Sequence, residues 1–192
     1  MNNYEKAAYL KLKDFQAPEG MKSFYIPMND GKKIRTCIWL KENHSRGTIL
    51  LQQGHNEFIE KYYEVINEFL DRNFSVICFD WRGQGKSERN INDIHKQYIR
   101  DFDIYNRDLN KILKDIVNPF FPKPLIAVGH SMGGCIILSA LLDHNTEINA
   151  SILMSPMLGF KNELVLSSLT FFLNLIIDDK SYFLLSKPNM GR

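Results

Sequence analysis

A serine stands between two glycines in the segment 129–133 (GHSMG). Four apolar residues precede this segment and a sequence typical of a helix follows it, so the pattern predicts a strand, a sharp turn and a helix. A serine hydroxyl at the apex of such a turn can attack an acyl carbon when a base takes up its proton. This nucleophile-elbow geometry is strained and needs small neighbours, which Gly129 and Gly133 supply. A serine that only caps a helix needs no second glycine, so the pattern favours Ser131 as a nucleophile.

The negative charge that develops on an attacked carbonyl oxygen needs hydrogen-bond donors. In an elbow, one donor is the backbone N–H of the residue after the serine, here Met132, and the second comes from the loop after the preceding central strand. That loop is the segment 53–57 (QGHNE), which follows an apolar run. Gly54 allows the backbone to approach closely, and we expect the N–H of His55 to be the second donor.

Six strands and three helices are expected to position these residues. The strands are predicted at 24–26, 33–39, 48–51, 74–79, 125–128 and 148–157, and the helices at 58–70, 93–117 and 132–144. The segment 29–31 (NDG) predicts a β-hairpin between the first two strands, and prolines from Pro119 onward are expected to end the second helix. Apolar strands that alternate with helices indicate an α/β fold with a mostly parallel sheet and helices on both faces.

The composition is that of one soluble globular domain, with 192 residues, 44% hydrophobic and 24% charged. A formal net charge of +2 gives no strong electrostatic field, so we expect no nucleic-acid partner. Cys37, Cys78 and Cys135 are far apart and flanked by apolar residues, which is typical of buried thiols in a reducing compartment. We expect neither metal nor cofactor. The first residues include no apolar signal-peptide core, and we therefore expect a cytoplasmic protein.

Three blocks carry a resemblance to a known family: the loop 53–57, the turn 80–87 (DWRGQGKS) and the elbow 129–134 (GHSMGG). In this order they resemble the lysophospholipase and monoacylglycerol lipase branch of the α/β-hydrolases, the serine-aminopeptidase-like group, over about 24–156. The resemblance implies an α/β-hydrolase fold and a serine ester hydrolase that forms an acyl-enzyme from a monoacyl lipid or small ester. Gln53 departs from the family, in which many members carry histidine before the loop glycine.

The triplet 85–87 (GKS) also resembles the end of a phosphate-binding loop. That motif requires a glycine five positions before Gly85, where this sequence has Asp80. We therefore expect no nucleotide site, and we expect Asp80 and Arg82 to be structural residues of the loop after the strand.

The sequence offers no complete catalytic triad. Hydrolases of this fold carry serine, acid and histidine in that chain order, and only His144 follows Ser131. Thirteen residues of helix would place His144 about 20 Å from the serine, out of contact. His130 should point away from Ser131, and His55 at the oxyanion loop is the alternative base. Two further histidines, His44 and His95, lie in polar contexts. None of the downstream aspartates follows a buried strand: Asp143, Asp178 and Asp179.

Three regions are expected: an N-terminal arm at 1–20, the N-terminal part of the α/β-hydrolase core at 21–158, and the start of a helical cap at 159–192. The apolar segment 164–177 is too short to span a membrane. It fits a core helix, a helix that covers an apolar pocket, or an interfacial helix in peripheral contact with the inner membrane.

The resemblance implies that the strands bearing the triad acid and histidine follow the cap. We therefore expect a truncated or split hydrolase whose sheet ends at an exposed edge strand, 148–157. A complementing C-terminal polypeptide would complete it. The alternative is a catalytically dead remnant, or a module of the same fold that binds an apolar ligand.

Overall fold

The computed structural model describes residues 4–10, 16–41, 44–92, 97–143 and 146–159. The chain divides into two compact units, 1–157 and 158–192, and every helix and strand described lies in the first. The predicted cap from residue 160 onward, including the apolar segment 164–177, lies outside the described residues. So do His95, His144 and the aspartates at 178 and 179.

Six strands form one sheet in the order β1-β2-β4-β3-β5-β6. The two strands β1 and β2 form the predicted hairpin, and β2 runs antiparallel to β4. From β4 onward the strands are parallel, with Leu50 of β3 level with Ile77 of β4 and Ala127 of β5. This confirms the mostly parallel sheet. The strand bounds are β1 Lys22–Pro27, β2 Lys33–Trp39, β3 Thr48–Gln52, β4 Ser75–Phe79, β5 Leu125–His130 and β6 Ala150–Met154.

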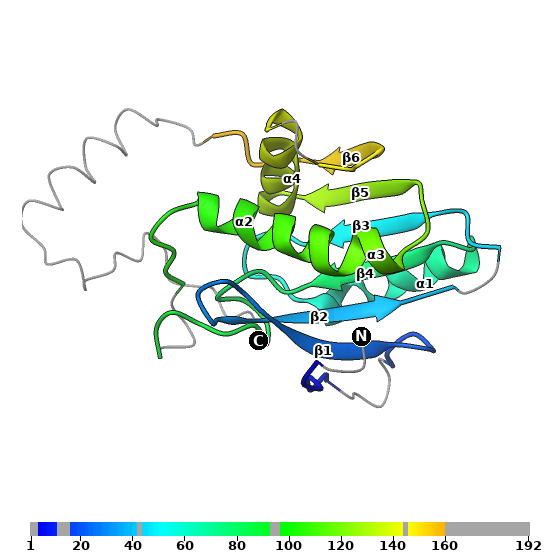
Figure 1. Cartoon of the computed structure of the whole chain (residues 1–192), viewed down its shortest axis with the longest axis horizontal. Coiled ribbons are helices and arrows are strands. Elements are labelled where there is room, and N and C mark those ends of the chain that lie inside the picture. Colours follow the sequence, from blue (N-terminus) through cyan, green and yellow to red (C-terminus); the bar gives the residue numbers. More distant parts are fainter. Residues whose placement is uncertain (1–3, 11–15, 42–43, 93–96, 144–145, 160–192) are drawn as a thin grey trace, which may run out of the picture. The chain divides into compact units, whose positions relative to one another are not determined.

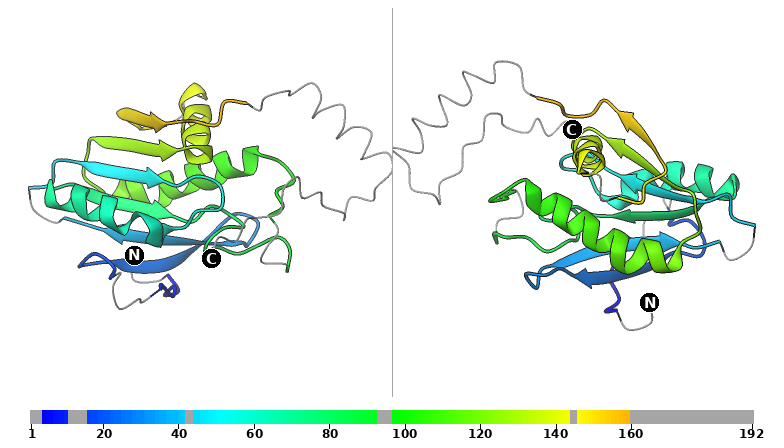
Figure 2. Two further views of the ribbon diagram at one scale, coloured as in Figure 1. Left: turned by 180° about the vertical axis from the view of Figure 1, so that it is seen from behind. Right: turned by 45° about the horizontal axis from the view of Figure 1, so that its top comes forward.

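Helices cover both faces of the sheet, as predicted. Figure 1 shows α2 and α3 in front of the strands, and the reverse view in Figure 2 shows α1 on the other face. The helix bounds are α1 Tyr63–Asp71, α2 Asp103–Ile112, α3 Asn118–Phe120 and α4 Met132–Leu142, and a 3₁₀ turn, Ile59–Tyr62, precedes α1. After α1, Asn73 has φ 68°, the left-handed conformation expected of a residue that ends a helix.

The core lies in two layers, because alternate side chains of each strand point to opposite faces. Leu50 and Ala127 pack in the layer that includes residues of α2 and α4, whereas Ile49 and Val128 pack in the layer that includes residues of α1. All residues of β3 and β4 are buried, which explains why their sequences are continuous apolar runs.

The second helix begins at Asp103, so the predicted start at 93 is wrong. Tyr98, Ile99 and Phe102 match a helical spacing, but residues 97–101 are not helical, and Asp101 makes two hydrogen bonds to the start of the helix. Its carboxylate accepts the N–H of Asp103 at 3.0 Å, and its carbonyl accepts the N–H of Ile104 at 3.1 Å. These bonds satisfy N–H groups that the first turn of a helix leaves unpaired.

The helical conformation continues three residues beyond the predicted end at 117. A π turn at Leu113–Val117 connects α2 to α3, and Pro119 lies in the first turn of α3. Proline is tolerated there because that position needs no N–H donor. The chain leaves the helical conformation at Phe121, which precedes Pro122.

Among the described strands, β6 lies at the edge of the sheet beside β5, where the edge strand was predicted. Ile152 and Met154 of β6 are exposed. On the opposite edge, part of the N-terminal arm lies beside β1, where the N–H of Ala7 donates to Ser23 O at 3.1 Å. Over the described residues, no helix combines the length and the apolar character that crossing a membrane requires.

Candidate active site

Ser131 joins β5 to α4 in a strained backbone conformation, with φ 49° and ψ −114°. Its N–H donates to Met154 O, and its carbonyl accepts the N–H of Met157, both at 3.0 Å. The strained turn is therefore fixed by hydrogen bonds to the end of β6 and to the residues after it. This is the geometry expected of a nucleophile elbow, although the role of Ser131 as nucleophile stays a prediction.

The glycines beside Ser131 are required by close packing. A Cβ atom on Gly129 would lie 2.7 Å from Ile137 Cδ1, and one on Gly133 would lie 2.6 Å from Gln53 O. Since real Cβ atoms do not approach other atoms so closely, any side chain would move α4 away from the end of β3. The glycines thus let the first turn of α4 contact the backbone that leads into the predicted oxyanion loop.

The predicted oxyanion loop faces the serine. A Cβ atom on Gly54 would lie 3.1 Å from Ser131 Cβ, so the loop and the elbow are in contact. Within the described residues, no hydrogen bond engages the N–H of His55 or of Met132. The structure brings the two predicted donors to the same end of the sheet as Ser131, and their role stays a prediction.

Glu57, which the sequence analysis did not single out, collects several donors beside Ser131. Its Oε2 accepts the N–H of Gly54 at 2.8 Å and the hydroxyl of Tyr62 at 2.6 Å, and it lies 3.1 Å from His130 Nδ1. Lys61 donates to Oε1 at 2.9 Å. Burial opposes the charged form, but these four partners outweigh it and lower the pKa of Glu57 to about 2.

This lowered pKa predicts a pH-dependent contribution to stability. The unfolded carboxyl, with a pKa near 4.5, binds a proton before the folded one does, so the contribution is present above about pH 4.5 and is lost as the pH falls towards 2. We expect the difference in unfolding free energy between wild type and Glu57→Gln to shrink between about pH 7 and about pH 3.5. Urea denaturation at both values measures it, and a difference independent of pH would contradict the prediction.

Gln53 has a structural role. Its side-chain Nε2 donates to Phe79 O at 2.9 Å, and its backbone carbonyl accepts the indole N–H of Trp81 at 2.9 Å. The side chain is fully buried. Gln53 therefore connects the end of β3 to the end of β4 beside the predicted oxyanion loop.

Asp80 and Arg82 are structural, as expected. The Asp80 carboxylate accepts the N–H of Lys86 at 2.7 Å and the N–H of Ile59 at 3.0 Å, and a Cβ atom on Gly85 would lie 2.2 Å from it. Arg82 donates through Nε and Nη2 to the Asp108 carboxylate, each at 2.8 Å. The turn 80–87 is thus folded around the carboxylate of Asp80, which also anchors the start of the 3₁₀ turn before α1.

A buried charge network connects this turn to β2. Arg35 donates to both oxygens of Glu60 at 2.6 and 2.7 Å, and through Nε to Asp80 at 2.6 Å. The exposed fractions of these side chains are 0%, 4% and 0%, so water contributes little to stabilising the charges, and Arg35 together with nearby backbone N–H groups must do so. The only sequence signal for the network was an arginine within an apolar strand.

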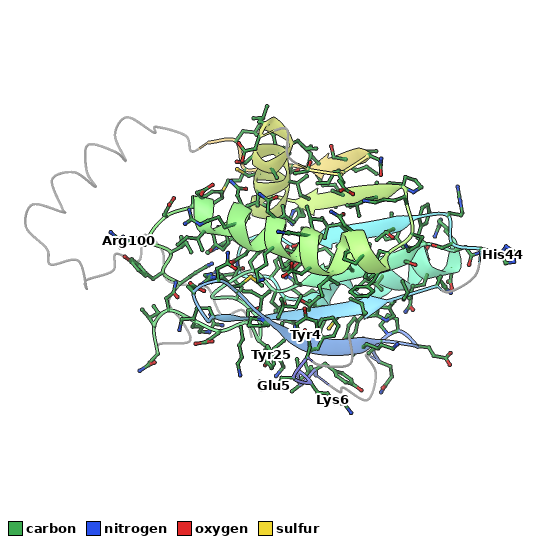
Figure 3. All side chains as sticks on the ribbon, in the orientation of Figure 1. Tyr4, Glu5, Lys6, Tyr25, His44 and Arg100 are labelled. Carbon is green, nitrogen blue, oxygen red and sulfur yellow. The ribbon has the colours of Figure 1, made fainter. Side chains whose placement is uncertain are left out.

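No described histidine contacts Ser131 through a hydrogen bond. His130 turns to Glu57, in agreement with the expectation that it points away from the serine. His44 precedes β3 and lies at the opposite end of the parallel strands (Figure 3). Partial desolvation lowers the pKa of His55, which favours a neutral imidazole, but no hydrogen bond joins it to Ser131. In the described ranges, no group of three or more His, Cys, Asp or Glu side chains could hold a metal ion.

Comparison with known families identifies the chain. The family model described as serine aminopeptidase, S33, matches residues 43–183. The chain belongs to this family. The match includes the oxyanion loop, the turn 80–87 and the elbow, the three blocks on which the resemblance rested.

The chain is similar to proteins named lysophospholipase and monoglyceride lipase. The chain is 31% identical to the probable lysophospholipase L2 of Haemophilus influenzae over 118 residues, 62% of this chain and 37% of that protein. It is 30% identical to lysophospholipase L2 of Escherichia coli over 130 residues, 68% and 38% of the two chains. For monoglyceride lipase of Rattus norvegicus the identity is 26% over 129 residues, 67% and 41%. The chain therefore spans well under half the length of these relatives.

Solved structures show the same fold. The α/β-hydrolase GrgF from Penicillium sp. sh18 superposes with a TM-score of 0.64 at 15% identity, covering 81% of this chain and 52% of that one. DcsB in complex with its substrate analogue gives a TM-score of 0.66 at 18% identity, with 80% and 51% covered. At these identities the likeness shows the α/β-hydrolase fold and nothing more specific.

Proposed function

We propose that this chain carries the nucleophile and oxyanion parts of a serine ester hydrolase that acts on monoacyl lipids. The observation that carries the proposal is the strained conformation of Ser131 directly opposite Gly54, with the N–H groups of Met132 and His55 unpaired among the described residues. A strained serine beside free backbone donors is the arrangement that acyl transfer requires.

The reaction would proceed through an acyl-enzyme. Ser131 Oγ loses its proton to a base and forms a bond to the ester carbonyl carbon, while the carbonyl oxygen becomes an oxyanion that accepts the N–H groups of Met132 and His55. The alcohol leaves with a proton from the base. Water then attacks the acyl group by the same route, which releases the fatty acid and restores the serine.

The substrate class is inferred from the relatives. Proteins named lysophospholipase and monoglyceride lipase are similar to this chain over about two thirds of its length, and their names specify monoacyl lipids. We propose a monoacyl lipid, or another small ester, as substrate. The predicted cytoplasmic location, and contact of 164–177 with a membrane surface, stay predictions.

We propose that the acid and histidine of the triad come from outside the described residues, either from further residues of a longer hydrolase or from a complementing polypeptide. Within the described ranges the base is missing beside Ser131, because His130 is engaged by Glu57 and His44 lies at the other end of the sheet. A serine without a base is a weak nucleophile. The chain on its own is therefore expected to turn over esters at very low rates.

A fluorophosphonate probe tests the proposed function, because covalent labelling requires an activated serine. The completed form is this chain together with the acid and the histidine of the triad, supplied either as further residues of a longer hydrolase or by a complementing polypeptide. We expect labelling of Ser131 in the completed form and little labelling of the 192-residue chain alone. Ser131→Ala is the control and should abolish labelling in both cases. Hydrolysis of p-nitrophenyl acyl esters, measured in parallel, reports turnover.

The second candidate function is non-catalytic binding of an apolar ligand by the same fold, which the missing base favours. Folded protein whose Ser131 stays unlabelled in the completed form would support this alternative and exclude the hydrolase. Ser131-dependent turnover by the chain alone, at ordinary enzyme rates, would contradict the proposal that triad residues must be supplied.

A further inference from the structure

The Glu57 carboxylate joins three segments that are separate in the sequence. It contacts Gly54 in the predicted oxyanion loop, Tyr62 at the end of the 3₁₀ turn, and His130 at the last position of β5. His130 immediately precedes Ser131. The cluster therefore lies where the loop and the elbow meet, and 73 residues of chain separate Glu57 from His130.

The contacts restrict the loop from both ends. The N–H of Gly54 is bound to Glu57 at 2.8 Å, and the N–H of Ile59 is bound to Asp80 at 3.0 Å. Because peptide groups are planar, fixing the N–H of Gly54 leaves only the dihedral angles of Gly54 itself to decide where the N–H of His55 points. The serine opposite Gly54, at 3.1 Å from its would-be Cβ, limits those angles further.

We propose that Glu57 is a positioning residue for the oxyanion hole, and that its carboxylate holds the Gly54–His55 segment against the residue before the nucleophile. This proposal rests on the proposed function. The Glu57 side chain is only 16% exposed, although the His130 side chain that it contacts is 41% exposed. Hydrogen bonds to a carboxylate are stronger than bonds between neutral groups, which suits a residue that must hold a loop containing a flexible glycine.

His130 has a structural role in the same cluster. Its Nδ1 faces the Glu57 carboxylate at 3.1 Å and the Tyr62 hydroxyl at 3.4 Å. The charged and titratable groups around Glu57 are thus Lys61, Tyr62 and His130. In this arrangement His130 supports the loop and does not act as the base for Ser131.

Amide hydrogen exchange measured by NMR on the full chain tests the proposal. In Glu57→Ala we expect exchange at Gly54 to rise by about tenfold or more, because its N–H loses a charged acceptor. Glu57→Gln keeps one acceptor oxygen and should restore part of the protection. Glu64→Ala is the matched control, since Glu64 is an exposed acid on α1, and it should leave exchange at Gly54 unchanged. Should Glu57→Ala fail to fold, Tyr62→Phe keeps the carboxylate and removes one of its donors, with a smaller rise expected.

The rate of fluorophosphonate labelling of Ser131 in the completed form separates positioning from simple stabilisation. A slower rate in Glu57→Ala, measured under conditions in which the variant is still folded, supports the proposal. Unchanged exchange at Gly54, or a normal labelling rate despite a loosened loop, would overturn it. If wild type is never labelled, the proposed function fails, whereas the holding of the loop by Glu57 is still decided by the exchange rates.

Discussion

Replacement of Arg35 by methionine is expected to lower the free energy of unfolding by about 3–5 kcal/mol, the cost of removing one partner of a buried ion pair. Arg35 is fully buried and is the only cation that contacts Glu60 or Asp80 among the described residues. Methionine fills a similar volume but leaves two buried carboxylates without a cation, and the N–H groups that still donate to them do not neutralise their charge. Urea denaturation followed by circular dichroism measures the change.

The matched control is Lys33→Met on the same strand. Lys33 pairs with Glu5 at 2.6 Å, but both side chains are about half exposed, so solvent screens the pair and its loss should hardly change stability. Equal losses for the two variants would contradict the interpretation that burial makes the Arg35 network costly to break. Because Asp80 also binds the N–H of Ile59, Arg35→Met should additionally loosen the end of the predicted oxyanion loop.

Replacement of Gly133 by alanine is expected to lower the free energy of unfolding by about 1–3 kcal/mol, the usual cost of overpacking. The new methyl group would lie 2.6 Å from Gln53 O and 2.8 Å from Gln52 O, and both are backbone atoms that cannot rotate away. Alanine is favoured over glycine inside a helix by about 1 kcal/mol, so any observed loss reflects this contact. In the completed form, labelling of Ser131 should also slow, since α4 and the oxyanion loop must separate.

The neighbouring substitution Gly134→Ala serves as the control for helix propensity. A methyl group there would lie 3.1 Å from Gly129 O and 3.2 Å from Pro156 Cβ, which small shifts can relieve. We expect a clearly smaller effect than for Gly133→Ala. If both variants behave alike in thermal and urea denaturation, close approach between α4 and β3 is not what requires Gly133.

Local sequence signals were sufficient for the sheet and for the elbow. Buried strands such as β3 and β4 are short apolar runs bounded by turn residues, and the strained serine is surrounded by the glycines that its packing requires. The prediction of where α2 starts failed for a local reason too. A helical spacing of apolar residues begins before Asp101, although the helix itself begins only after this residue. The spacing of apolar residues alone does not distinguish a helix from the segment that leads into it.

The charge clusters could not be predicted from the sequence, since their partners are far apart in the chain. Arg35 lies 25 residues from Glu60 and 45 from Asp80, and Glu57 lies 73 residues from His130. An arginine in an apolar strand shows that a buried cation needs anions, but many carboxylates are available. Only the strand order, which places β2 beside β4 and β3 beside β5, selects the partners.

The strained turn at Ser131 depends on an edge strand, because the Ser131 N–H donates to Met154 O in β6 and the Ser131 carbonyl accepts the N–H of Met157 just after it. Among the described residues β6 is paired on one side only, and edge segments open more often than central ones. Whenever β6 separates from β5, the strain at Ser131, typically about 1–3 kcal/mol, favours relaxation to an ordinary turn. The time for which Ser131 keeps its strained conformation is therefore set by how often β6 separates from β5, and not by the stability of the core.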